Sequence, residues 1–227
     1  MEEHDEGPKQ STTHEKGAAS GRVNEPLGTP MTDNQFRYVL LAGLILVLPI
    51  GIYHRIKSRT GEKLDRLQEG IFILISLRLL GLLGIIGLLA FIINPSWMAW
   101  SSVPLPQWLR WIGVALGVVA AVLLVWTFRT LGKNLTDTVV TRKEHTLVTT
   151  GPYRWVRHPF YVFFALAVLA NSLVAANWFL FITGAAAFLL LVVRTRKEEA
   201  KLVERFGDAY HQYMSRTGRF FPRITVL

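Results

Sequence analysis

Three apolar runs, each close to 20 residues long, constrain this chain more than any other feature of its sequence. They cover residues 36–53, 70–93 and 108–128. A helix needs about 20 apolar residues to cross the hydrocarbon core of a bilayer. The runs lack the alternation of apolar and polar residues that is typical of membrane β-strands. The sequence therefore predicts an all-α polytopic membrane protein.

A fourth apolar region, residues 160–193, is interrupted by small and polar residues at 170–177. Each half has about 14 to 16 residues, which corresponds to roughly 21 to 24 Å of helix. This pattern predicts a helical hairpin whose halves are either tilted or stop short of the far side of the bilayer. With the three longer runs, we expect about five transmembrane helices, the last two forming the hairpin.

The charges of the chain are distributed as orientation in a membrane requires. The net charge is +9, and Lys and Arg gather in the connections after the first, third and fourth apolar regions. The connection at residues 94–107 has no charge and carries Pro and Trp instead. Because basic loops stay on the cytoplasmic side, we expect the N-terminus outside and the basic loops in the cytoplasm. This distribution argues against nucleic acid as a partner, although the net charge alone would suggest it.

The composition divides the chain into three regions. Residues 1–34 are rich in Gly, Pro, Ser, Thr and Glu and have little to pack, which predicts a disordered tail. Residues 35–129 hold the N-terminal transmembrane helices, and residues 130–227 hold the polar motifs described below. In the last region, residues 196–216 carry apolar side chains at helical spacing, which predicts an amphipathic helix. The chain has no Cys, which excludes disulfides, zinc thiolate sites and Cys nucleophiles.

The first polar motif is residues 145–161, HTLVTTGPYRWVRHPFY. Gly151-Pro152 is a turn signal, and Pro159 suits the first turn of a helix that starts after His158. The free amides of that first turn favour a carboxylate or another electron-rich group. The rings of Tyr153 and Trp155 can stack on a flat ligand. The alternative is a basic, aromatic loop that only anchors a span at the membrane surface.

The second motif follows the hairpin. Arg194 and Glu198 are spaced by four, as are Leu202 and Phe206 after them, so all four share one helical face. If Leu202 and Phe206 face inward, Arg194 and Glu198 do so as well, which is costly unless they bind something. The alternative is an ordinary ion pair on a helix surface. Glu199 lies beside this face and is a further candidate. Metal-binding spacings such as HExxH are absent from the sequence, so we expect no metal site.

The two motifs, the hairpin between them and the closing RFFPRI resemble the isoprenylcysteine carboxyl methyltransferase family over about residues 130–224. That family belongs to a group of integral-membrane methyltransferases that includes phospholipid N-methyltransferases. The resemblance implies S-adenosylmethionine as methyl donor, bound at the cytosolic membrane face. It also implies Arg194 and Glu198 as catalytic residues, with Arg194 facing the substrate. The implied cofactor contacts are His145, Thr146, Leu147, Val148, Tyr153, His158, Pro159, Phe160, Tyr161, Glu198 and Glu199.

The resemblance favours methyl transfer to the carboxylate of a lipophilic acceptor, either a small molecule or a lipidated protein, that enters from the bilayer. Two positions depart from the family pattern: Phe163 replaces a frequent Gly, and Thr138 replaces a Gln found in eukaryotic members. An N-methyltransferase acting on phospholipids or amines is the first alternative. A sterol-reductase-like enzyme that uses nicotinamide and a non-enzymatic membrane scaffold are the others.

Overall fold

The computed structural model describes residues 32–58, 70–132 and 146–223. Within these ranges the regular structure is helical, with two isolated β-bridges and no strand. The elements, in chain order, are α1 (Asp33–Lys57), α2 (Ile71–Ile93), η2 (Pro95–Ser101), α3 (Gln107–Leu131), η4 (Gly151–Arg154), α4 (Pro159–Ala175), α5 (Trp178–Phe206) and α6 (Asp208–Arg216). The predicted all-α class is confirmed. The predicted disordered tail, residues 1–34, lies outside the described residues up to position 31.

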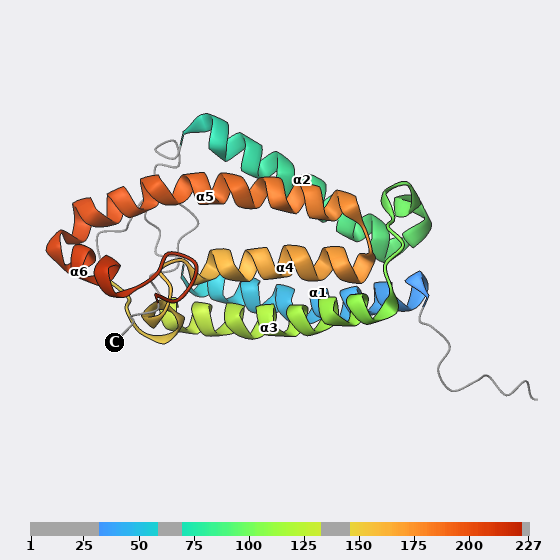
Figure 1. Cartoon of the computed structure of the whole chain (residues 1–227), viewed down its shortest axis with the longest axis horizontal. Helices are drawn as coiled ribbons and strands as arrows, with labels where there is room; N and C mark the ends of the chain where they lie inside the picture. The colour runs from blue at the N-terminus through green and yellow to red at the C-terminus, as the bar shows by residue number, and fades with distance from the viewer. Residues whose placement is uncertain (1–31, 59–69, 133–145, 224–227) are drawn as a thin grey trace, which may run out of the picture. The chain divides into compact units, whose positions relative to one another are not determined.

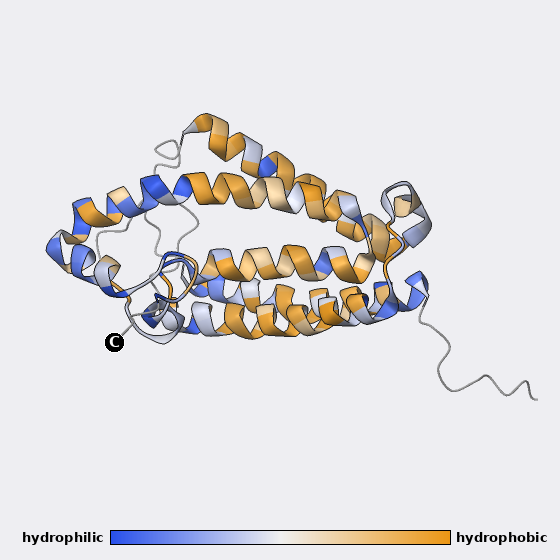
Figure 2. Cartoon of the chain, viewed as in Figure 1, coloured by the Kyte–Doolittle hydropathy of each residue, from blue (hydrophilic) through white to orange (hydrophobic). Residues whose placement is uncertain are grey.

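Four of these helices, α1, α2, α3 and α5, are long and apolar enough to cross a membrane. Their large apolar side chains point outward along much of their length, and Figure 2 shows the apolar stretch of each helix beside those of its neighbours. Outward-facing Leu, Ile, Phe and Val over this length fit a lipid environment, where they remain in apolar surroundings. The chain is therefore an integral membrane protein.

The helix α4 lies at the centre of the bundle although it is the shortest of the apolar helices. It packs mainly on α3 and also contacts α5 and α1, while α5 runs beside α2, as Figure 1 shows. Its 17 residues span roughly 25 Å at the helical rise. The helix is therefore shorter than the hydrocarbon core is thick, and the free backbone groups at its two ends need partners within the protein.

Arg110 of α3 supplies such a partner at the C-terminal end of α4. Its Nε and Nη2 donate to the carbonyl oxygen of Val174 over 2.9 and 2.8 Å. Its Nη1 donates to Oδ1 of Asp33 over 2.7 Å, and its guanidinium lies 3.8 Å from the centroid of the Phe36 ring. One buried Arg thus joins the start of α1, the start of α3 and the end of α4.

The predicted hairpin is present, and a buried Asn forms its turn. The chain reverses at Ala176, whose φ of 48° is left-handed, and Asn177 is then the N-cap of α5. The side chain of Asn177 accepts from the amide of Leu180 and donates to the Ser101 hydroxyl over 2.7 Å. The polar interruption at residues 170–177 therefore ties the hairpin to η2.

The polar end of the chain differs from the prediction. A single amphipathic helix was expected over residues 196–216, but α5 continues from the apolar hairpin to Phe206 without a break. The break falls at Gly207, whose φ of 51° is favoured by Gly, and α6 follows as a separate helix. One rigid helix therefore joins the apolar bundle to the charged segment.

The contact between α3 and α4 depends on small residues, which gives a stability prediction. A Cβ added at Gly113 would lie 2.8 Å from the Cβ of Leu173, whereas one at Gly117 would lie 3.7 Å from that of Ala170. We expect Gly113→Ala to lower stability by about 1–3 kcal/mol, because the two backbones must separate. Gly117→Ala on the same helix is the control and should change it little. Thermal unfolding of both variants in detergent tests this, and equal midpoints would contradict it.

Candidate functional site

The polar residues of the chain gather at one end of the bundle, where α4 begins and α5 becomes charged. Figure 2 shows this end, around α6 and the polar half of α5, as hydrophilic. His158 is the N-cap of α4, and its side chain reaches both Glu198 and Glu199 on α5. The two polar motifs of the sequence therefore meet in space, 40 residues apart along the chain.

The carboxylate of Glu199 is the centre of this cluster. Arg157 Nε donates to its Oε1 over 2.9 Å, and Arg219 Nε donates to the same oxygen over 3.2 Å. A second nitrogen of Arg219 donates to Oε2. The Nε2 of His158 lies 3.2 Å from Oε1. The Glu199 side chain is only 8% exposed. These partners therefore replace the hydrogen bonds to water that the carboxylate loses when it is buried.

Glu198, the adjacent residue, is held less tightly and is more open. The Tyr161 hydroxyl donates to its Oε2 over 2.7 Å, and His158 Nδ1 lies 3.9 Å from its Oε1. Its side chain is 28% exposed. The rings of His158 and Tyr161 stack with centroids 5.3 Å apart. Glu198 therefore presents a negative charge that the protein orients from one side and leaves accessible.

A short segment near the C-terminus, residues 217–220, covers the cluster; we call it the C-terminal strap. The amides of Arg157 and His158 donate to the carbonyl oxygens of Gly218 and Arg219 over 2.8 and 3.1 Å. The guanidinium of Arg157 also donates to the carbonyl of Thr217. The strap thus lies alongside residues 156–158, just before α4, and forms the parallel bridge between Val156 and Gly218.

Tyrosine side chains enclose the other side of the site. The Tyr213 hydroxyl of α6 donates to the carbonyl oxygen of Tyr153 in η4 over 2.7 Å. Burial raises the pKa of the Tyr153 phenol well above its usual range, and the charge of Glu198 and the nearby Tyr213 raise it further. Burial likewise raises the pKa of Tyr213. Both phenols therefore remain neutral hydrogen-bonding groups at any physiological pH.

The remaining predicted residues are placed as follows. Pro159 is buried at the first position of α4, and the ring of Phe160 stacks on Phe128 of α3 at 6.1 Å. Thr146, Leu147 and Val148 lie before η4 in a stretch without regular secondary structure, and Arg194 is half-buried one turn before Glu198. His145 lies outside the described residues. The roles assigned to all of these residues stay predictions.

In the polar half of α5 the most buried side chains are Thr195 and Glu199, one residue further along the helix than the predicted pair Arg194 and Glu198. Four residues predicted to share one inward face are all half-buried: Arg194, Glu198, Leu202 and Phe206. The strap and residues 156–158 contact the Glu199 side of the helix, so that side is the most enclosed.

Two residues of the cluster, Arg157 and Arg219, escaped the sequence analysis. Each is separated from Glu199 by many residues, 42 and 20 respectively, so no helical spacing reveals the pairing. The available signal was indirect: a Glu at the end of a membrane helix needs a cation, and both RHP and RFFPR supply one.

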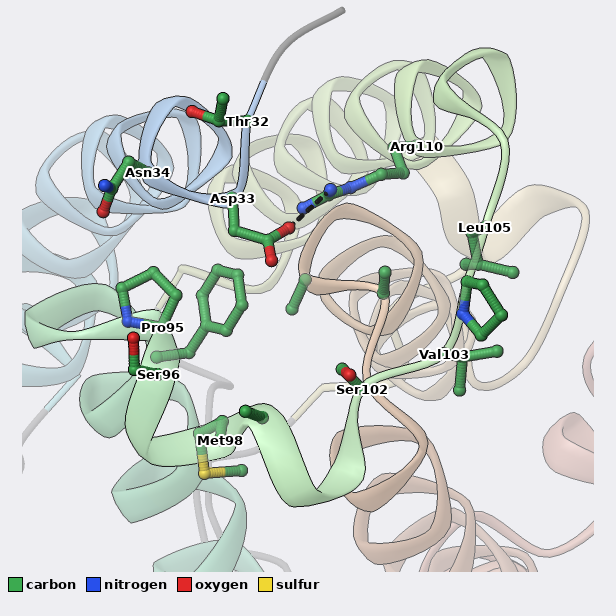
Figure 3. Close-up of a pocket in the computed structure, with 15 residues that line it drawn as sticks. Thr32, Asp33, Asn34, Pro95, Ser96, Met98, Ser102, Val103, Leu105 and Arg110 are labelled. Carbon is green, nitrogen blue, oxygen red and sulfur yellow. Dashed lines mark hydrogen bonds and ion pairs between the residues drawn. The ribbon is translucent and has the colours of Figure 1, made fainter.

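A cavity of about 590 Å³ lies at the opposite end of α4, beside the pair formed by Asp33 and Arg110, as Figure 3 shows. Proline, methionine and serine side chains of η2 and its flanks form much of its wall. None of the predicted site residues lines it. Arg110 is already engaged in capping α4, so we place the candidate functional site at the polar end, where the titratable groups converge.

The cluster around Glu199 gives a second prediction. Glu199→Gln leaves Arg157 and Arg219 close together without their shared charge, and breaking a buried pair typically costs about 3–5 kcal/mol. For a chain of this size we expect the unfolding midpoint to fall by roughly 10 °C. The control is Glu204→Gln, because Glu204 is 71% exposed in its pair with Lys201. Similar midpoints for the two variants would mean that Glu199 does not hold the cluster together.

The part of the chain that contains α4 and most of α5 is similar to known proteins. Residues 112–204 match the model of the isoprenylcysteine carboxyl methyltransferase (ICMT) family. A nickel-cobalt-cadmium resistance protein, NccN, of Alcaligenes xylosoxydans xylosoxydans is 32% identical over 117 residues, which are 51% of this chain and 54% of that protein. The protein-S-isoprenylcysteine O-methyltransferase of Homo sapiens is 30% identical over 128 residues, 55% of this chain and 45% of that protein.

The chain thus spans about half the length of these curated relatives. A solved structure described as the eukaryotic intramembrane Ras methyltransferase ICMT aligns with 84% of this chain and 63% of its own, with a TM-score of 0.49 and 22% identity. The resemblance carried by the two polar motifs is confirmed: residues 112–204, from α3 through the polar part of α5, are related to the isoprenylcysteine carboxyl methyltransferase family.

Proposed function

We propose that this protein is a methyltransferase that uses S-adenosylmethionine and methylates the carboxylate of a lipophilic acceptor at the membrane surface. One observation carries the proposal. His158 and Tyr161, at the start of α4, meet Glu198 and Glu199 of α5 at the polar end of an apolar bundle. These four residues lie within the segment related to the methyltransferase family.

The proposal divides the chain as the sequence does. Residues 35–129 provide membrane helices, and residues 130–227 provide the catalytic region. The basic residues at the ends of α1, α3 and α5 lie at the same end as the site, so the positive-inside rule supports a cytoplasmic site and an external N-terminus.

The residues at the site fit the charge of the donor. S-adenosylmethionine carries a positive sulfonium and, when bound, supplies an electrophilic methyl group. Glu198 offers an oriented and accessible carboxylate, which favours a cationic ligand and can accept from its hydroxyls. The neutral ring of Tyr153 lies close enough for Glu198 to affect its pKa. Tyr153, His158 and Tyr161 therefore supply aromatic surface and hydrogen bonds beside the charge of Glu198.

Arg194 is the residue that we assign to the acceptor. It is half-buried on α5, one helical turn toward the apolar half from Glu198. A guanidinium holds a carboxylate by two parallel hydrogen bonds, which an ammonium cannot reproduce. A carboxylate acceptor is already ionised at neutral pH, since an α-carboxyl titrates near about 3.5. The oxygen then attacks without a general base, and the protein has to orient the acceptor and exclude water.

The alternative acceptor, an amine of a phospholipid or another amphiphile, has a different requirement. An ammonium must lose a proton before its nitrogen can attack, so that reaction requires a base. Glu198 or His158 would have to take this role. Glu198 already accepts a hydrogen bond from Tyr161, and His158 already contacts Glu199. A carboxylate acceptor is therefore better supported, because it needs no base and gives Arg194 a role.

The test is transfer of label from S-adenosylmethionine to a membrane lipid extract by the purified protein, with the rate followed against pH. Carboxyl methylation should give a base-labile methyl ester and a rate that is flat above about pH 5. Amine methylation should give a base-stable product and a rate that falls steeply below the pKa of the amine. If the protein neither binds the donor nor labels any species, the proposed function is overturned and the non-enzymatic scaffold remains.

A variant series tests the assigned residues. Arg194→Ala should lower kcat/KM by roughly 100-fold or more, because a charged contact to the acceptor is lost, while the affinity for the donor stays close to that of the wild type. The matched control is Arg196→Ala, since Arg196 is exposed on the same helix. His158→Ala should weaken donor binding. Equal losses of turnover and donor affinity in Arg194→Ala would show that its role is misassigned.

A further inference from the structure

We propose that the C-terminal strap, residues 217–220, is a positioning element of the site, and that Arg219 and Phe220 are positioning residues for the Glu198 carboxylate. The inference rests on the proposed function, because it assigns Glu198 to the donor. The strap lies beyond residue 204, where the match to the family model ends.

The backbone of the strap is fixed against the start of α4. The amides of Arg157 and His158 both donate to its carbonyl oxygens, and Arg157 adds its guanidinium. Arg157 also donates to Glu199. One side chain therefore contacts the strap and α5 together, and the position of the strap relative to both helices is determined.

Arg219 links the strap to Glu199, the neighbour of Glu198 on α5. It contacts both carboxylate oxygens of Glu199, which fixes the rotation of α5 about its own axis at this point. Consecutive residues of a helix point roughly 100° apart, so a fixed Glu199 sets the direction in which Glu198 points. Glu199 and Glu198 thus have different tasks: the first joins α5 to the strap and the second faces the ligand.

Phe220, the next residue of the strap, acts on Glu198 through the aromatic rings beside it. Its ring centroid lies 5.8 Å from that of His158, 6.4 Å from that of Tyr161 and 6.3 Å from that of Phe188 on α5. Tyr161 donates its hydroxyl to Glu198. Because Phe220 packs on the ring that orients this carboxylate and on the helix that carries it, its removal lets both shift.

Equilibrium binding of labelled S-adenosylmethionine to the full-length protein in lipid nanodiscs tests the proposal. Phe220→Ala should raise the Kd roughly tenfold, the size expected when one or two aromatic contacts are lost. Phe220→Tyr keeps the ring and should restore binding. The control is Phe221→Ala, because Phe221 is the neighbouring residue of the same type and its side chain is 82% exposed.

Arg219→Lys and Arg216→Ala extend the test to the charged contact. Lys keeps the charge without the two-pronged geometry, so Arg219→Lys should weaken donor binding. The exposed Arg216 should be replaceable without effect. Helical content and unfolding midpoint are measured for every variant, so that loss of the fold is recognised.

The outcomes separate this inference from the proposed function. Donor binding by the wild type together with an unchanged Kd in Phe220→Ala overturns the role of the strap and leaves the proposed function standing. An equal loss in Phe220→Ala and Phe221→Ala overturns it as well. A wild-type protein that does not bind the donor overturns the proposed function itself, and the inference with it.

Discussion

The arrangement at the polar end depends on one carboxylate, that of Glu199, and on the three cationic or imidazole side chains around it. A single buried acid is costly in a membrane protein, but here its partners come from two other segments of the chain. Arg157 and His158 lie just before α4, Glu199 lies in α5, and Arg219 lies in the C-terminal strap. The energetic need of each charged group for a partner is what brings these segments together.

The opposite end of α4 follows the same logic with different residues. Arg110 satisfies a terminal carbonyl of α4 and pairs with Asp33 at the start of α1. A helix of 17 residues in an apolar bundle leaves terminal backbone groups that water does not reach easily. At the C-terminal end of α4, Arg110 satisfies such a group. At the other end, Arg157 holds the covering strap instead. Close to the C-terminal end, α3 and α4 approach each other at a small residue, Gly113 of α3, which faces Leu173 of α4.

The membrane helices were predictable because lipid imposes length and composition on consecutive residues. The expected spans at residues 36–53 and 70–93 correspond to α1 and α2, which extend at most a few residues further. The local motif at His158 and Pro159 likewise predicted the start of α4. These features leave a pattern within one stretch of chain, which is all that a single sequence displays.

Tertiary pairing leaves no such pattern. The contacts of Glu199 with Arg157 and Arg219 join residues far apart in the sequence, and neither partner differs in type from the many other basic residues near the membrane. The inward face of α5 was assigned from Leu202 and Phe206, but the covering segments decide which face is buried. The break at Gly207 was missed because the apolar spacing continues across it from α5 to α6.

The continuity of α5 has a consequence for how this protein can vary. From Trp178 to Phe206 the helix has no break, so removing one residue anywhere in its lipid-facing half would turn the charged half by roughly 100°. Glu199 would then take the direction of Glu198, and every partner would meet the wrong side chain. Insertions and deletions in this apolar stretch are therefore restricted as strictly as substitutions at the site, while its exposed apolar residues, such as Leu189 and Val193, can be exchanged for other apolar residues.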